Sequence, residues 1–143
     1  MNRGDAENAE ISRRGMEPDS HLNSITNGVI GAAIEVHKIL GSGCLEPVYE
    51  EVLVIELALR EIAFKRRHRF NLELKGHVIG NGRIDLLVED RLIVEIESVD
   101  ALLPIHQAQL ISYLKALDLQ LGLILNFKVP ILKSGIRRII YTK

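Results

Sequence analysis

Tryptophan is absent from this 143-residue chain, and phenylalanine and tyrosine together supply only 4% of it. Because 47% of the residues are nonetheless hydrophobic, the core of a single domain must be built from leucine, isoleucine, valine and alanine. The one cysteine, Cys44, excludes an internal disulfide, as expected for a protein of a reducing compartment.

Long apolar runs and a strong excess of charge are also missing. No segment is long enough to span a bilayer, and no secretion signal precedes the first apolar stretch near Ile25. We therefore expect a soluble, cytoplasmic protein without a membrane partner. The formal net charge of −1 provides no overall positive field, so any contact with nucleic acid would need a local basic patch.

The N-terminal part of the chain predicts a tail followed by two helices. Residues 1–21 are polar and lack periodicity, which predicts a flexible tail ahead of one domain over residues 22–143. Apolar residues then recur at helical spacing until the glycines at 41 and 43, and a second helix is expected over residues 46–61. The predicted apolar stripe of this second helix consists of Leu45, Val48, Tyr49, Val52, Ile55 and Leu59.

The rest of the chain alternates between short strands and one helix. A turn is predicted at Gly80-Asn81-Gly82, and residues 89–91 are expected to join two strands. Strands are expected over residues 70–75, 84–88, 92–97, 121–127 and 135–141, with a helix over residues 104–117. The order α-α-β-β-β-α-β-β, with a strand, a helix and a buried strand in succession, predicts an α/β fold with a mixed sheet.

Acidic residues stand inside two of these predicted strands. Glu95 and Glu97 share one face of their strand, and Asp85 is predicted to share a face with Leu87, opposite Ile84, Leu86 and Val88. With a loop over residues 89–91, Asp85 lies directly across from Glu95.

Two opposed carboxylates repel each other, and burial increases the cost. Either one acid holds a proton, or a cation such as Mg²⁺ or Mn²⁺, which take oxygen ligands, lies between them. The alternative is that the acids reach solvent at the end of the sheet and pair with Arg83 or Arg91. The spacing of the residues leaves both interpretations open.

The densest basic run covers residues 65–69. It could follow a phosphate backbone, or it could be a solvated connection between a helix and a strand. The residues that we expect to contact nucleic acid are Lys65, Arg66, Arg67, Arg69 and Lys115.

Residues 43–49 read G-x-x-E-x-x-Y, with Glu46 and Tyr49 at the last two defined positions. This segment resembles the motif of the GxxExxY proteins, a family of the PD-(D/E)xK nuclease-like superfamily. The resemblance continues through residues 84–88, 94–96, 106–110, 126–127 and 135–138. It implies a restriction-endonuclease-like core, made of a helix, a three-stranded meander, a crossover helix and a further strand.

The resemblance also implies roles for individual residues. Asp85 and Glu95 are similar to the two metal-binding acids of the superfamily, and Glu46 is similar to the acid that joins them from the preceding helix. Gln109 and Tyr113, on one face of a helix, are similar to the Q-x-x-x-Y element of the exonuclease branch. The implied cofactor is Mg²⁺ or Mn²⁺.

One position departs from the superfamily motif, which has lysine two residues after the second acid. Glu97 stands there, and it could act as a general base. Lys115 or Lys75 could supply the missing cation.

Three hypotheses follow. The first is a metal-dependent nuclease that hydrolyses phosphodiester bonds in DNA or RNA, with DNA favoured over RNA, and with Asp85, Glu95, Glu97, Gln109 and Tyr113 in the catalytic machinery. The second is an inactive binding module that keeps the fold without the chemistry. The third is self-association, as a homodimer, through the N-terminal helices.

Overall fold

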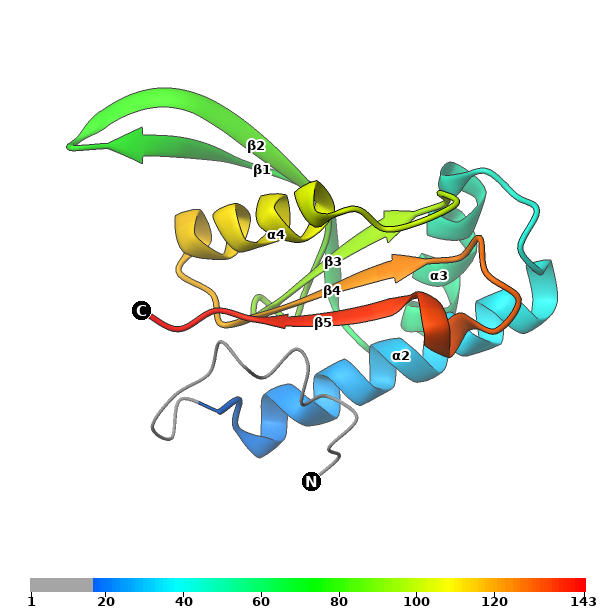
Figure 1. The fold of residues 1–143 in the computed structure, drawn as a ribbon. Helices are drawn as coiled ribbons and strands as arrows, with labels where there is room; N and C mark the ends of the chain where they lie inside the picture. Colours follow the sequence, from blue (N-terminus) through cyan, green and yellow to red (C-terminus); the bar gives the residue numbers. More distant parts are fainter. Residues whose placement is uncertain (1–16) are drawn as a thin grey trace.

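The computed structural model describes residues 17–143 (Figure 1), so most of the predicted tail lies outside the described residues. Helix α2 (Ser20–Leu40) begins two residues before the predicted domain boundary. It begins there because the Asp19 side chain caps it, accepting a hydrogen bond from the Leu22 amide at 2.8 Å. Arg91, in the turn before β3, in turn holds the Asp19 carboxylate.

Five strands form one mixed sheet in the order β1-β2-β3-β4-β5. The strands are β1 (Phe64–Leu74), β2 (His77–Val88), β3 (Leu92–Glu97), β4 (Leu121–Asn126) and β5 (Ile136–Ile140). Helix α4 (Pro104–Leu117) connects β3 to β4, which are parallel, whereas all other neighbours are antiparallel. The predicted α/β class, the mixed sheet and the crossover helix are confirmed.

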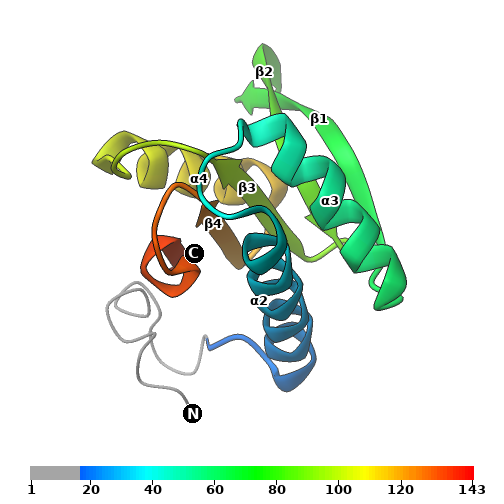
Figure 2. The same ribbon diagram turned by 90° about the vertical axis from the view of Figure 1, so that its right-hand side faces the viewer.

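Helices cover both faces of the sheet (Figures 1 and 2). Helices α2 and α3 (Glu46–Leu59) pack on one face against Leu86, Val94 and Leu123, and α4 packs on the other against Ile93 and Ile124. Strand β4 is buried along its whole length, as predicted for a central strand. Within residues 17–143 no helix is long and apolar enough to cross a membrane.

The first hairpin differs from the prediction. Its two-residue turn is Lys75-Gly76, where both residues have positive φ (50° and 82°), and Gly80-Asn81-Gly82 lies inside β2. Gly82 stands opposite Phe70, whose ring would be 2.5 Å from a Cβ atom at that position. The glycine therefore provides room for an aromatic ring and marks no turn.

Two further sequence predictions are wrong. The basic residues 65–69 belong to β1, not to a connection, so β1 begins six residues before the predicted strand. Helix α3 buries Tyr49, Leu53 and Leu57, whereas Leu45, Val48, Ile55 and Leu59 of the predicted stripe are exposed.

Candidate functional site

Asp85 and Glu95 meet where β2 separates from β3. The ladder between these strands ends at Leu86↔Val94, and β2 continues only with β1. Just beyond the last pair, the Glu95 Oε2 atom accepts a hydrogen bond from the Asp85 amide at 3.1 Å. The Asp85 Oδ2 atom accepts one from the Ile96 amide at 2.8 Å. The two carboxylates, the acid pair below, thus replace the backbone partners that the ladder no longer provides.

Strand β1 has an irregular residue opposite this separation. Arg67, opposite Asp85, has a left-handed φ of 49° and is missing from the register of the ladder. Ile84 packs with Leu87 on the α4 face, whereas regular alternation predicted it on the face of Leu86. The positive φ of Arg67 could not be predicted from the sequence, because an arginine gives no signal for it.

The acid pair carries an unfavourable concentration of negative charge. Burial, then the neighbouring Asp85 charge, raise the pKa of Glu95 to about 9, with Glu97 adding to the effect. In the absence of a cation, this raised pKa favours the protonated form of Glu95, which allows it to lie beside the Asp85 carboxylate. This is one of the two arrangements expected for opposed acids.

Glu46 and Glu97 extend the pair to four acids, called the acid cluster below. Glu46 lies in the first turn of α3. Its partial burial raises its pKa, and the negative charges of Asp85 and Glu50 raise it further. Burial, then Glu46 and Asp85, raise the pKa of Glu97 at the end of β3, and His106 opposes this shift. The influence of Asp85 on Glu46, and of Glu46 on Glu97, indicates that the start of α3 lies near the two strand acids.

The donor set of this cluster is suited to a hard divalent cation. In the described part of the chain, no three histidine, cysteine or acidic side chains are already grouped to hold a metal. However, Mg²⁺ is commonly held by only one or two carboxylates together with water and substrate phosphate. Each acid of the pair accepts a hydrogen bond from a backbone amide, and carboxylate oxygens are ligands of the kind that this ion takes, so the residues present fit such an ion.

A short loop fixes the start of α3 and with it Glu46. The buried Tyr49 hydroxyl donates to the Gly41 carbonyl at 2.6 Å and accepts from the Cys44 amide at 3.2 Å. The Ser98 hydroxyl, next to Glu97, donates to the Cys44 carbonyl at 3.0 Å. The loop before Glu46 is thereby tied to the residue after Glu97. No local sequence pattern indicated this role of Ser98.

Helix α4 brings Tyr113 to the acids. Burial raises the pKa of Tyr113, and the charges of Glu95 and Asp85 raise it further. The Tyr113 ring also packs edge to face on Phe70, with 5.2 Å between the ring centroids. Gln109, one turn earlier, is exposed, and in the described part of the chain no hydrogen bond or ion pair connects it to the cluster.

His106, which sequence reasoning did not select, stands at the start of the same helix. Its Nδ1 atom accepts a hydrogen bond from the Leu103 amide at 2.8 Å, so Nε2 carries the proton of the neutral ring. Lys115 follows nine residues later, about 13 Å along the axis, and Lys75 lies in the hairpin turn at the far end of β2. His106 is therefore nearer to Glu97 than either predicted lysine.

The predicted nucleic-acid contacts fall into two groups. Lys65 pairs with Asp90, and Arg66 and Arg67 both pair with the buried Glu50. Within residues 17–143, Arg69 and Lys115 have no ion pair, and both are exposed. Part of the basic run is thus engaged inside the protein.

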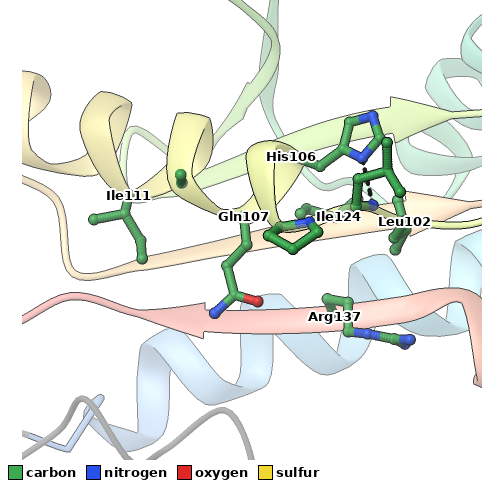
Figure 3. Close-up of a pocket in the computed structure, with 9 residues that line it drawn as sticks. Leu102, His106, Gln107, Ile111, Ile124 and Arg137 are labelled. Carbon is green, nitrogen blue, oxygen red and sulfur yellow. Dashed lines mark hydrogen bonds between the residues drawn. The ribbon is translucent and has the colours of Figure 1, made fainter.

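A cavity of about 460 Å³ lies between the start of α4 and strands β4 and β5 (Figure 3). Gln107 extends from α4 toward β5, where Arg137 lies. His106 also lines the cavity, but no residue of the acid cluster does. The acids therefore lie outside this cavity.

Comparison with known proteins identifies the family. Residues 23–139 match the family model described as the PD-(D/E)XK nuclease superfamily. No curated protein and no solved structure matches the chain. The match covers most of the chain, and the mixed five-stranded sheet with helices on both faces is consistent with the restriction-endonuclease-like fold of this superfamily. The chain therefore belongs to the PD-(D/E)XK nuclease superfamily.

Proposed function

We propose that this protein is a metal-dependent nuclease that hydrolyses phosphodiester bonds in DNA, with the acid cluster as its active site. Membership in the superfamily points to a nuclease-type function and a nucleic acid substrate, and nucleases of this superfamily generally depend on divalent metal ions. The observation that carries the proposal is the approach of the Asp85 and Glu95 carboxylates at the end of the β2–β3 ladder.

Asp85 and Glu95 would hold Mg²⁺ or Mn²⁺, and Glu46 would join them from α3. A divalent ion held there would polarise the scissile phosphate and lower the pKa of a bound water. Hydrogen bonds from the Tyr49 and Ser98 hydroxyls hold the loop before Glu46, and this loop keeps Glu46 beside the strand acids.

Glu97 would accept the proton of the attacking water. Its raised pKa is compatible with that role, because a general base works best when its pKa lies near the working pH. Tyr113, beside the acid pair, would donate a hydrogen bond to a phosphate oxygen, and Gln109 would reach the substrate only from the exposed side of α4.

Cleavage of a labelled DNA duplex tests this proposal. We expect cleavage in Mg²⁺ or Mn²⁺, none in EDTA, and a loss of at least a hundredfold in Asp85→Asn, because the variant removes a charged ligand. The matched control is Asp118→Asn, the same chemical change at an exposed residue that pairs with Lys143. Equal cleavage by both variants would contradict the assignment of Asp85.

An inactive binding module is the second candidate, and a specific observation favours it. Each carboxylate of the pair accepts a hydrogen bond from a backbone amide, which is a structural role without chemistry. The resemblance to the superfamily motif, which has lysine where Glu97 stands, points the same way. This candidate predicts binding of DNA without cleavage, and cleavage that appears in Glu97→Lys. Cleavage by the wild type that Glu97→Lys abolishes would exclude it.

The homodimer stays a prediction of its own. Helix α3 exposes Val48, Ile55 and Leu59, which are apolar. Light scattering over a range of protein concentrations distinguishes a monomer from a dimer.

A further inference from the structure

Beyond the separation from β3, β1 and β2 continue as a two-stranded ribbon over residues 68–84. Its ladder runs from His68↔Ile84 to the turn at Lys75-Gly76, and no other strand of residues 17–143 pairs with it. Figure 1 shows the ribbon arching past α4 and away from the rest of the sheet. A ribbon that projects in this way offers two faces, and they differ in chemistry.

The inner face holds the ribbon to the domain. Phe70 packs on Tyr113 of α4, Gly82 leaves room for the Phe70 ring, and Ile84 joins the apolar cluster beneath α4. The ribbon is thus fixed at its base on the same helix that brings Tyr113 to the acid cluster.

The outer face carries four exposed polar side chains, called the outer patch below. Arg69 stands directly opposite Arg83, and Asn71 directly opposite Asn81 one pair further along. Directly opposed side chains on a sheet have Cβ atoms about 5 Å apart, so two arginines at such positions repel each other. The arginine pair therefore does not stabilise the fold.

Neither arginine of the outer patch is neutralised. Within residues 17–143, no carboxylate forms an ion pair with Arg69 or Arg83, whereas Lys65, Arg66 and Arg67 nearby are all paired. The ribbon contains a single acid, Glu73, which lies beyond the shift in register between Leu72 and Glu73. A chain of net charge −1 therefore concentrates unpaired positive charge and amide donors on one small surface.

We propose that the outer patch binds the phosphate backbone of duplex DNA. This inference rests on the proposed function for its choice of ligand. Each guanidinium offers donors in a planar fork that matches phosphate oxygens, and each asparagine amide can donate to a phosphate oxygen. Duplex DNA carries one negative charge for about every 1.7 Å of its axis, which suits two closely spaced cations.

The position of the patch relates it to the acid cluster. Arg83 precedes Asp85 by two residues on β2, a separation of about 7 Å along the strand. The outer patch and the acid pair are therefore neighbours along β2, although the patch lies on the face of the ribbon turned away from Tyr113. A duplex bound by the patch would be held beside the segment of β2 that carries Asp85.

The test is the affinity of the full chain for a fluorescently labelled DNA duplex, measured by anisotropy in EDTA at several salt concentrations. The double variant Arg69→Gln/Arg83→Gln is expected to bind about tenfold or more weakly. The slope of log K against log salt should fall by about 1.8, because two phosphate contacts are lost. The matched control is Lys38→Gln/Lys133→Gln, which removes the same charge from exposed residues of α2 and the short helix before β5.

An equal loss of affinity in both double variants, or no loss in either, would overturn the inference, as would a wild type that binds no duplex. A single strand or an RNA duplex of the same sequence that binds more tightly would overturn the assignment to duplex DNA. Because binding is measured in EDTA, the result is independent of cleavage. Weakened binding in the arginine variant of a protein that never cleaves DNA would support the patch and refute the proposed nuclease.

Discussion

Replacement of Tyr49 by phenylalanine tests how the loop before Glu46 is held. The change removes one hydroxyl group and preserves the ring, which is fully buried. This ring stacks on that of Phe127, with 4.3 Å between the ring centroids. The lost interactions are the bond to the Gly41 carbonyl at 2.6 Å and the bond from the Cys44 amide at 3.2 Å.

The expected cost follows from these two bonds. A hydrogen bond within a protein contributes a net of about 1 kcal/mol, so the free energy of unfolding should fall by about 2 kcal/mol. Water that reaches the released Gly41 carbonyl and Cys44 amide would reduce the loss toward about 1 kcal/mol. The loss of packing should be negligible because the aromatic ring stays in place.

Urea denaturation followed by far-ultraviolet circular dichroism measures the change, since the chain lacks tryptophan as a fluorescent probe. The midpoint should fall at unchanged slope, which identifies a change in stability. Tyr141→Phe is the control, because that tyrosine is only half-buried and its hydroxyl has no hydrogen bond within residues 17–143, so its effect should stay within about 0.5 kcal/mol. Equal midpoints for Tyr49→Phe and the wild type would refute the account of the loop.

Three further predictions concern stability. Gly135→Ala should unfold at a markedly lower urea concentration, because a Cβ atom there would collide with the Asn126 carbonyl oxygen, and an unchanged midpoint would show that the backbone can yield. Glu95→Gln should stabilise the protein in EDTA at pH 7. Because the pKa of Glu95 is raised to about 9, the wild type loses stability as the pH rises from about 4.5 to 9, and the loss at pH 7 is about 3 kcal/mol. The melting temperatures of wild type and variant should therefore converge below pH 4.5. Asp19→Asn should remove a contribution that is present above pH 4 and lost as the pH falls toward 2, since the hydrogen bond from Arg91 and that from the Leu22 amide lower the pKa of Asp19 to about 2, and identical acid denaturation curves would contradict this.

Much of the fold could be predicted from the sequence. Strand β3 and helix α4 have the predicted bounds, because each has a clear apolar pattern and a proline or a turn at its start. The register between Asp85 and Glu95 followed from the length of the turn over residues 89–91, and the ladder runs in that register up to Leu86↔Val94.

The remaining features depend on contacts between distant residues. Helix α3 is apolar on nearly all sides, so its periodicity could not show that Leu53 faces the core and Ile55 the solvent. The glycines at 80 and 82 suggest a turn by composition. In the structure they stand opposite Leu72 and Phe70 on the neighbouring strand and leave room for those side chains. The tie from Ser98 to Cys44 joins residues 54 positions apart and leaves no local pattern.

The most direct test of the metal centre is a calorimetric titration of Mn²⁺ into the wild type, into Asp85→Asn and into the control Asp118→Asn. If the acid cluster is a metal centre, the wild type and the control should bind Mn²⁺ with similar affinity, and Asp85→Asn should bind about tenfold or more weakly. Equal affinity in all three proteins, or no binding by the wild type, would contradict the proposal that these acids hold a catalytic ion.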